Sequence, residues 1–149
     1  MGTGRIPTAT LVFDDTGSIY GTTAEGGGHE CFSARFEFGC GVVFQLTPPA
    51  VAGGPWTENI LFNFSQSDGA QGALPNSLAF LNGALYGTTC YTGRRSISTP
   101  ANGGLFQLAP PAASGGAWTE TTLSTFTNSQ AHLRHHDAVK VSGSVACNF

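Results

Sequence analysis

The sequence predicts an all-β protein, and three observations support this prediction. Apolar residues occur in short runs rich in Val, Ile, Phe, Tyr and Thr, which suit a pleated, half-buried surface. Gly, Pro, Asp and Asn separate these runs, and such residues favour turns. No stretch combines helical periodicity with capping residues. The expected architecture is therefore a set of antiparallel strands joined by turns.

The runs form an internal repeat, because three segments of the first half recur in the same order in the second half. LVFDDTGSIYGTT at residues 11–23 recurs as LAFLNGALYGTT at residues 78–89, VFQLTPP at 43–49 recurs as LFQLAPP at 105–111, and GGPWTENILFNF at 53–64 recurs as GGAWTETTLSTF at 115–126. We expect two repeat units followed by an atypical tail in which the pattern stops. These three parts span residues 1–65, 66–128 and 129–149.

Each unit is expected to form four antiparallel strands. In the first unit, the runs predict strands near residues 9–13, 18–23, 41–46 and 56–64. The segment DDTG at residues 14–17 and the segment LNG in the second unit place Asp or Asn beside Gly, which accepts positive φ and closes a hairpin. PPAVAGG and PPAASGG join the third strand to the fourth, because Pro ends a strand and Gly lets the chain reverse.

Tandem four-stranded units that each carry an aromatic motif are typical of β-propeller blades. Insertions between the second and third strands, at residues 24–39 and 90–102, explain why these units exceed the ~40–50 residues of common blades. A closed propeller needs ~4–8 blades, whereas this chain supplies two. Three arrangements stay open: a partial propeller within a longer repeat protein, closure by homo-oligomerisation, and face-to-face packing of the two units.

The residues that recur in both units are interpreted as structural. A Tyr ring packs between sheets, Gly lets another group come close, Thr suits strand ends, and a Trp that recurs once per unit is a packing anchor. These residues are Tyr20, Gly21, Thr22, Thr23 and Trp56 in the first unit and Tyr86, Gly87, Thr88, Thr89 and Trp118 in the second.

Composition argues against several partners. The chain has a formal charge of −3, and its six basic residues are scattered, so it lacks the basic patch that nucleic acids require. No window approaches the ~18 apolar residues that span a bilayer, and the start, MGTGRIPTAT, lacks the apolar core of a signal peptide. We expect no nucleic acid, no membrane span and no cofactor.

Several segments resemble the GloVer tandem repeat of bacterial surface proteins. The matching segments are GSIYGTTAEGGG, GVVFQLTP, WTENILFNFSQSDGAQ and the second copy GALYGTT, and together they cover about residues 11–128. After Phe126 the chain departs from the family pattern, with no third YGTT and no anchor. The resemblance implies display outside a bacterial cell, and it implies no known reaction.

We therefore expect a non-enzymatic extracellular repeat module that acts as a scaffold or a binding surface. Its unknown ligand would be recognised by the loops at residues 24–39 and 90–102, because binding usually resides in loops on a rigid frame. The alternative is a propeller-framed enzyme that acts on polysaccharide. Glu58 and Glu120 occupy equivalent positions and suggest a pair of catalytic carboxylates. Residues at equivalent places in neighbouring blades usually lie too far apart to share one sugar, and duplication explains their likeness, so we interpret these two residues as structural.

The cysteines have two interpretations. Because the resemblance implies an oxidising location, Cys31 and Cys40 are expected to form a disulfide that closes the loop between them. In a reducing compartment they would be ordinary thiols. Cys90 and Cys147 would pair only if the tail folds back.

The tail contains a candidate metal site in the segment HLRHHD. His132, His135, His136 and Asp137 carry ligand atoms suited to zinc, copper or nickel. The competing interpretation is a solvated tail, since short His tracts often bind metals only adventitiously.

Overall fold

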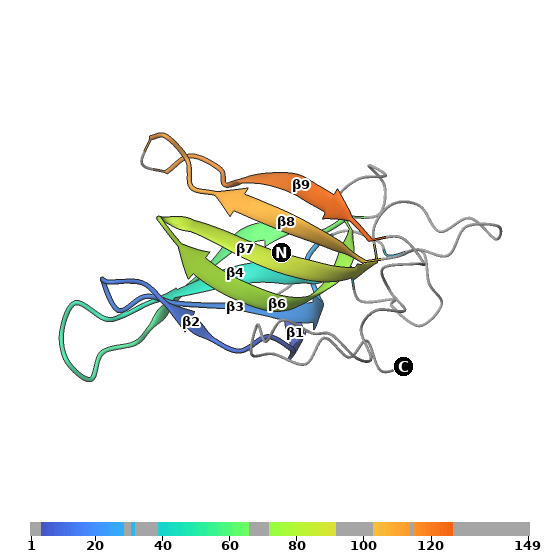
Figure 1. Cartoon of the computed structure of the whole chain (residues 1–149). Coiled ribbons are helices and arrows are strands. Elements are labelled where there is room, and N and C mark those ends of the chain that lie inside the picture. The colour runs from blue at the N-terminus through green and yellow to red at the C-terminus, as the bar shows by residue number, and fades with distance from the viewer. Residues whose placement is uncertain are drawn as a thin grey trace.

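A computed structural model shows an all-β protein and confirms the predicted fold class (Figure 1). It describes residues 4–28, 31, 39–65, 72–91, 103–113 and 115–126, and these residues form two antiparallel sheets without any helix. No helix in this part of the chain is long and apolar enough to cross a membrane.

The first sheet has the strand order β1-β3-β4-β5, and β2 also pairs with β3. Its strands are β1 (Arg5–Pro7), β2 (Val12–Phe13), β3 (Ile19–Glu25), β4 (Val42–Thr47) and β5 (Thr57–Asn63). The second sheet has the order β6-β7-β8-β9. Its strands are β6 (Ala73–Leu81), β7 (Ala84–Tyr91), β8 (Gly104–Ala109) and β9 (Thr119–Thr125).

The first unit differs from the expected four strands, because its first strand is divided into β1 and β2. In the second unit the corresponding strand is β6, which is continuous apart from an irregularity between Pro75 and Ser77. In the first unit, Pro7 pairs with Thr23 and Val12 with Tyr20, so four residues of the first strand stand opposite two of β3. This excess interrupts the ladder of hydrogen bonds, and the expected strand at residues 9–13 shortens to Val12–Phe13.

The two predicted hairpin turns are present. In the second sheet, Asn82 and Gly83 have φ values of 50° and 79°, the positive values that a tight turn of this kind requires. In the first sheet, the Asp14 carboxylate accepts hydrogen bonds from the backbone N–H groups of Thr16 at 2.8 Å and Ser18 at 3.0 Å. The Asp side chain therefore fixes the turn before β3.

The two sheets pack face to face through β3 and β6, with the second sheet in front of part of the first in Figure 1. The ring of Tyr20 stacks on Phe80 with centroids 5.4 Å apart, and Phe64 meets Phe106 edge to face at 5.2 Å. The core between the sheets contains Val43, Leu74, Leu85 and Leu108 besides these aromatic residues. The sheets are not closed into a ring, so the propeller interpretation stays a prediction.

Candidate functional site

The recurring YGTT and FQL segments lie side by side on neighbouring strands in both sheets. In the first sheet, Tyr20 pairs with Gln45 and Gly21 with Phe44. The second sheet repeats this register on β7 and β8. The Gln45 side-chain amide donates to the Tyr20 hydroxyl at 3.1 Å, and the equivalent bond from Gln107 to Tyr86 measures 2.8 Å. The two segments therefore form one structural motif.

The glycine of the motif makes room for the ring of the paired phenylalanine. A Cβ atom added to Gly21 would lie 2.5 Å from Cζ of Phe44, and one added to Gly87 would lie 2.5 Å from Cζ of Phe106. Neither distance is compatible with normal packing. A phenylalanine ring that covers a glycine on the neighbouring strand restores the packing that the glycine lacks.

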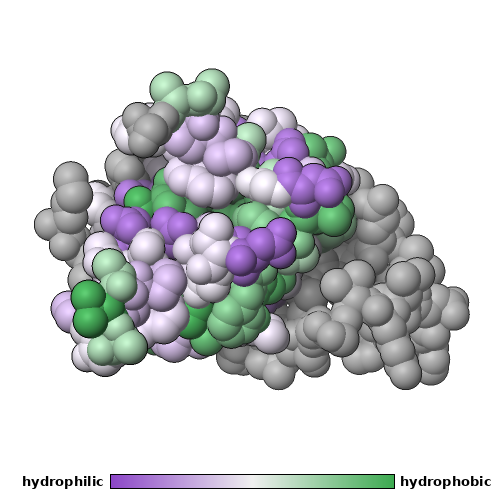
Figure 2. Space-filling model, turned by 90° about the vertical axis from the view of Figure 1, so that its left-hand side faces the viewer, coloured by the Kyte–Doolittle hydropathy of each residue, from purple (hydrophilic) through white to green (hydrophobic). Residues whose placement is uncertain are grey.

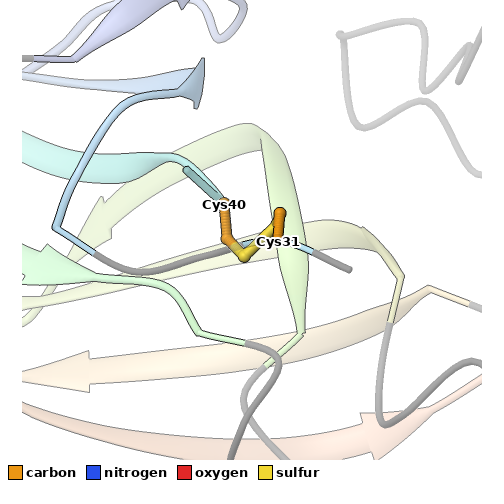
Figure 3. Close-up of a disulfide and its surroundings, with 2 residues drawn as sticks. All are labelled: Cys31 and Cys40. Atoms are coloured by element: carbon orange, nitrogen blue, oxygen red, sulfur yellow. A yellow bond between two sulfur atoms is a disulfide. The ribbon is translucent and has the colours of Figure 1, made fainter. Parts of the chain in front are cut away.

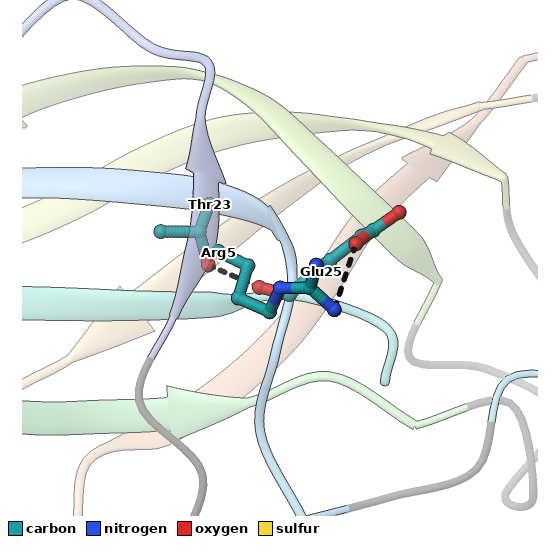
Figure 4. Close-up of polar contacts among 3 residues, drawn as sticks. All are labelled: Arg5, Thr23 and Glu25. Atoms are coloured by element: carbon teal, nitrogen blue, oxygen red, sulfur yellow. Dashed lines mark hydrogen bonds and ion pairs between the residues drawn. The ribbon is translucent and has the colours of Figure 1, made fainter. Parts of the chain in front are cut away.

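The threonines of the first motif bind both within the first sheet and across to the second. The Thr22 hydroxyl donates to the carbonyl oxygen of Pro75 on β6 at 3.3 Å. The Thr23 hydroxyl donates to the carbonyl oxygen of Glu25 at 2.7 Å (Figure 4). The side chains of Arg5 and Glu25 form an ion pair at 3.8 Å, which joins β1 to β3.

The threonines of the second motif bind within their own sheet. The Thr88 hydroxyl lies 2.7 Å from the Ser77 hydroxyl and donates to the side-chain oxygen of Asn76 at 2.6 Å. Thr89 is buried and pairs with Pro75 across the ladder. The equivalent residues Thr22 and Thr88 therefore differ: Thr22 makes a contact between the sheets, whereas Thr88 makes contacts within one sheet.

The Tyr20 hydroxyl also binds the turn before β3, because it donates to the Asp14 carboxylate at 2.8 Å. Burial and the neighbouring Asp14 carboxylate raise the pKa of Tyr20 to about 12. Burial alone would raise the pKa of Asp14, but the hydrogen bonds from Thr16, Tyr20 and Ser18 outweigh it and lower that pKa. Because the Asp14 carboxylate accepts all these hydrogen bonds, its role is to stabilise the turn.

Equivalent apolar residues have unequal exposure in the two sheets. We call the side of the first sheet that points away from the second sheet the outer face; its apolar residues are Leu11, Phe13, Ile19, Phe44, Leu46 and Ile60. Leu11 is 46% exposed and Phe13 is 61% exposed, and the other four are partly buried. Leu85, Phe106 and Leu108, which correspond to Ile19, Phe44 and Leu46, are at most 2% exposed because they pack against the first sheet.

The recurring tryptophans also differ. Trp56 is 47% exposed, whereas Trp118 is partly buried and packs against the core. Both lie just before the last strand of their unit. The packing-anchor interpretation therefore holds for Trp118, which contacts the core, and is wrong for Trp56, which is exposed.

The two carboxylates lie on different sides of the first sheet: Glu58 is on its outer face, and Glu120 projects from the second sheet toward its other face. Glu58 pairs with Leu46 and lies on the outer face, where it is exposed. Glu120 pairs with Leu108 on the side of the second sheet that faces the first sheet. Burial raises the pKa of Glu120, although a hydrogen bond from the Thr122 hydroxyl at 3.1 Å opposes this effect. The fold does not bring these two backbone positions to one site.

The expected disulfide between Cys31 and Cys40 is present, with Cα atoms 5.2 Å apart (Figure 3). Cys40 is fully buried, and its carbonyl oxygen accepts a hydrogen bond of 2.9 Å from the N–H group of Leu74 in β6. Cys90 is also disulfide-bonded, and its partner lies outside the described residues. The Cys31–Cys40 bridge therefore closes a loop whose end contacts the second unit.

Other sequence predictions fall mainly outside the described residues. His132, His135, His136 and Asp137 belong to this remainder, as do most residues of the two candidate ligand loops. Two loop predictions are corrected at their edges: Ala24 and Glu25 belong to β3, and Cys90 belongs to β7, because the strand ladders extend past the motif. Within the described ranges, no group of three His, Cys, Asp or Glu side chains is placed to hold a metal ion.

Comparison of the chain with protein-family models, curated protein sequences and solved structures found no significant match.

Proposed function

We propose that the chain is a non-enzymatic repeat module that serves as an extracellular scaffold or binding surface. The observation that carries this proposal is that the same contacts within a sheet, Tyr with Gln and Gly with Phe, recur in both units, while Tyr20 also packs between the sheets. The repeated contacts indicate that duplication preserved the frame of each sheet. Stacked sheets are the frame of a repeat protein.

The extracellular part of the proposal is supported by the disulfide and by the resemblance to the GloVer repeat. Disulfides persist in oxidising compartments and are rare in the cytosol. The resemblance rests on the YGTT, FQL and WTE segments, and the propeller-like arrangement of the units belongs to the same proposal. Antibodies raised against the purified chain should label intact cells of the source bacterium. Labelling only after the cells are permeabilised would overturn this part.

The alternative, an enzyme that acts on polysaccharide, makes a different prediction. Such an enzyme needs two carboxyl groups ~5–10 Å apart across one sugar. We expect the purified chain to release no reducing sugar from xylan, laminarin or starch. Release that Glu58→Gln or Glu120→Gln abolishes, in a variant that stays folded, would replace the scaffold proposal with the enzyme.

A further inference from the structure

We propose that two copies of this chain bind each other. The outer face of the first sheet in one copy packs on the second sheet of the other copy, on the side of that second sheet that points away from its own first sheet. We call that side the open face; it carries Leu81, Tyr86, Leu105 and Gln107. Copies would then associate head to tail. This inference names the partner of the proposed scaffold, and in that sense it rests on the proposed function.

The contact between the two sheets of one chain is the template for this association. In that contact, the side of the first sheet with Tyr20 and Gln45 meets the side of the second sheet with Phe80 and Phe106. The Tyr20 and Phe80 rings lie 15° from parallel. The template shows that these two kinds of face fit each other.

The outer face matches the buried partner in this template. Phe13 and Phe44 occupy the positions of Phe80 and Phe106, and each lies on the same side of its sheet. In the first sheet, however, Phe13 is 61% exposed, because no other sheet of the described chain lies against it. Adjacent large apolar residues left exposed on one side of a sheet mark an interaction surface.

The open face matches the other half of the template. Tyr86 and Gln107 repeat the hydrogen-bonded pair of Tyr20 and Gln45. Leu81 occupies the position that Asp14 has in the first sheet, and it is 57% exposed. At this position the open face is therefore more apolar than the side of the first sheet that carries Tyr20. When the two faces meet, Tyr86 of one copy stacks on Phe13 of the next.

The main contact residues lie near the hairpin turns. Phe13 directly precedes the turn before β3, and Leu81 directly precedes Asn82 and Gly83. Figure 2 views this end of the molecule and shows hydrophobic surface among hydrophilic residues. The contact joins two different faces, so repeating it gives a ring if the rotation closes and a filament if it does not.

Sedimentation of the purified full chain tests the inference. We expect a mass that rises with protein concentration above that of one chain. Phe13→Lys and Leu81→Lys should each raise the dissociation constant at least about tenfold, as expected for an anchor residue at an interface. Val51→Lys is the matched control, since Val51 is 75% exposed in the β4–β5 connection and belongs to neither face; it should change the constant less than about twofold.

A mixture of the two lysine variants gives the sharper result. Phe13→Lys keeps its open face and Leu81→Lys keeps its outer face, so an equimolar mixture should form heterodimers that grow no further. Circular dichroism would show that both variants keep the β fold. The inference is overturned by a wild-type chain that stays monomeric up to millimolar concentration, or by folded variants that do not pair. Because surface labelling of cells does not depend on this contact, the two proposals can fail separately.

Discussion

Gly21 and Gly87 explain why the YGTT motif recurs together with FQL. Each glycine lies beneath the ring of the phenylalanine paired with it on the next strand. The tyrosine before the glycine accepts a hydrogen bond from the glutamine after that phenylalanine. Changing one member of the motif therefore disturbs a partner on another strand.

Alanine at the two glycines should have unequal costs. At Gly87, the added Cβ would lie 2.5 Å from both the Phe106 ring and the backbone oxygen of Ser77, and Phe106 is 2% exposed. At Gly21 the nearest atoms belong to the side chains of Phe44 and Leu11, which can move toward solvent. Gly87→Ala should lower the free energy of unfolding by about 2–3 kcal/mol and Gly21→Ala by about 1 kcal/mol, as measured by urea denaturation. An equal or larger cost at Gly21 would contradict this account.

Glu120 makes the stability of the folded protein depend on pH. Burial raises its pKa, so folding favours the protonated acid. The contribution of Glu120 to stability is therefore complete at pH values below the pKa that its carboxyl has in the unfolded chain. It is lost as the pH rises through the pKa of the same carboxyl in the folded protein.

Glu120→Gln should accordingly raise the melting temperature slightly at pH 7 and leave it unchanged near pH 3.5. The glutamine oxygen can still accept the hydrogen bond from Thr122. Glu58→Gln is the matched control, because Glu58 has the same place in its sheet but is exposed. A stabilisation of Glu120→Gln that is as large in acid as at neutral pH would show that charge burial is not its cause.

Among the elements, those with the recurring segments could be predicted from the sequence, and β1 could not. Strands β3, β4, β5 and β7 contain runs of β-branched and aromatic residues bounded by turn residues. β1 has three residues and ends in Pro7, and three residues are too few to form a recognisable run of this kind. Its counterpart is the start of β6. Ala73, Leu74 and Pro75 correspond to Arg5, Ile6 and Pro7, but this correspondence becomes visible only when the pairing of the strands is known.

The loop between β3 and β4 should depend on its disulfide. Replacing Cys31 and Cys40 together by serine should lower the free energy of unfolding by about 2–3 kcal/mol, because the bridge limits the unfolded chain over a sequence separation of 9 residues. Urea denaturation of this double variant measures the loss. The double variant is preferable to a reducing agent, which would also reduce the disulfide of Cys90. A loss below about 0.5 kcal/mol would mean that the loop is held by its other contacts.

For the whole molecule, the sequence predicted two equivalent units but could not predict which apolar faces are covered. Phe13 and Phe80 have similar neighbours along the chain, yet only Phe80 stacks on Tyr20. Exposure depends on where the second sheet packs, and no local pattern contains that information. For the same reason, the equivalence of Glu58 and Glu120 did not reveal that they lie on opposite sides of the first sheet.

The apolar residues of the outer face lie at the surface, whereas their equivalents in the second sheet pack between the sheets. The free energies of unfolding of Phe80→Ala and Phe13→Ala test this difference most directly, measured at a protein concentration at which the wild-type chain is monomeric. Phe80→Ala should cost about 2–3 kcal/mol, since it removes a ring that packs between the sheets, and Phe13→Ala should cost less than about 1 kcal/mol. Equal costs, or a larger cost at Phe13, would contradict the account.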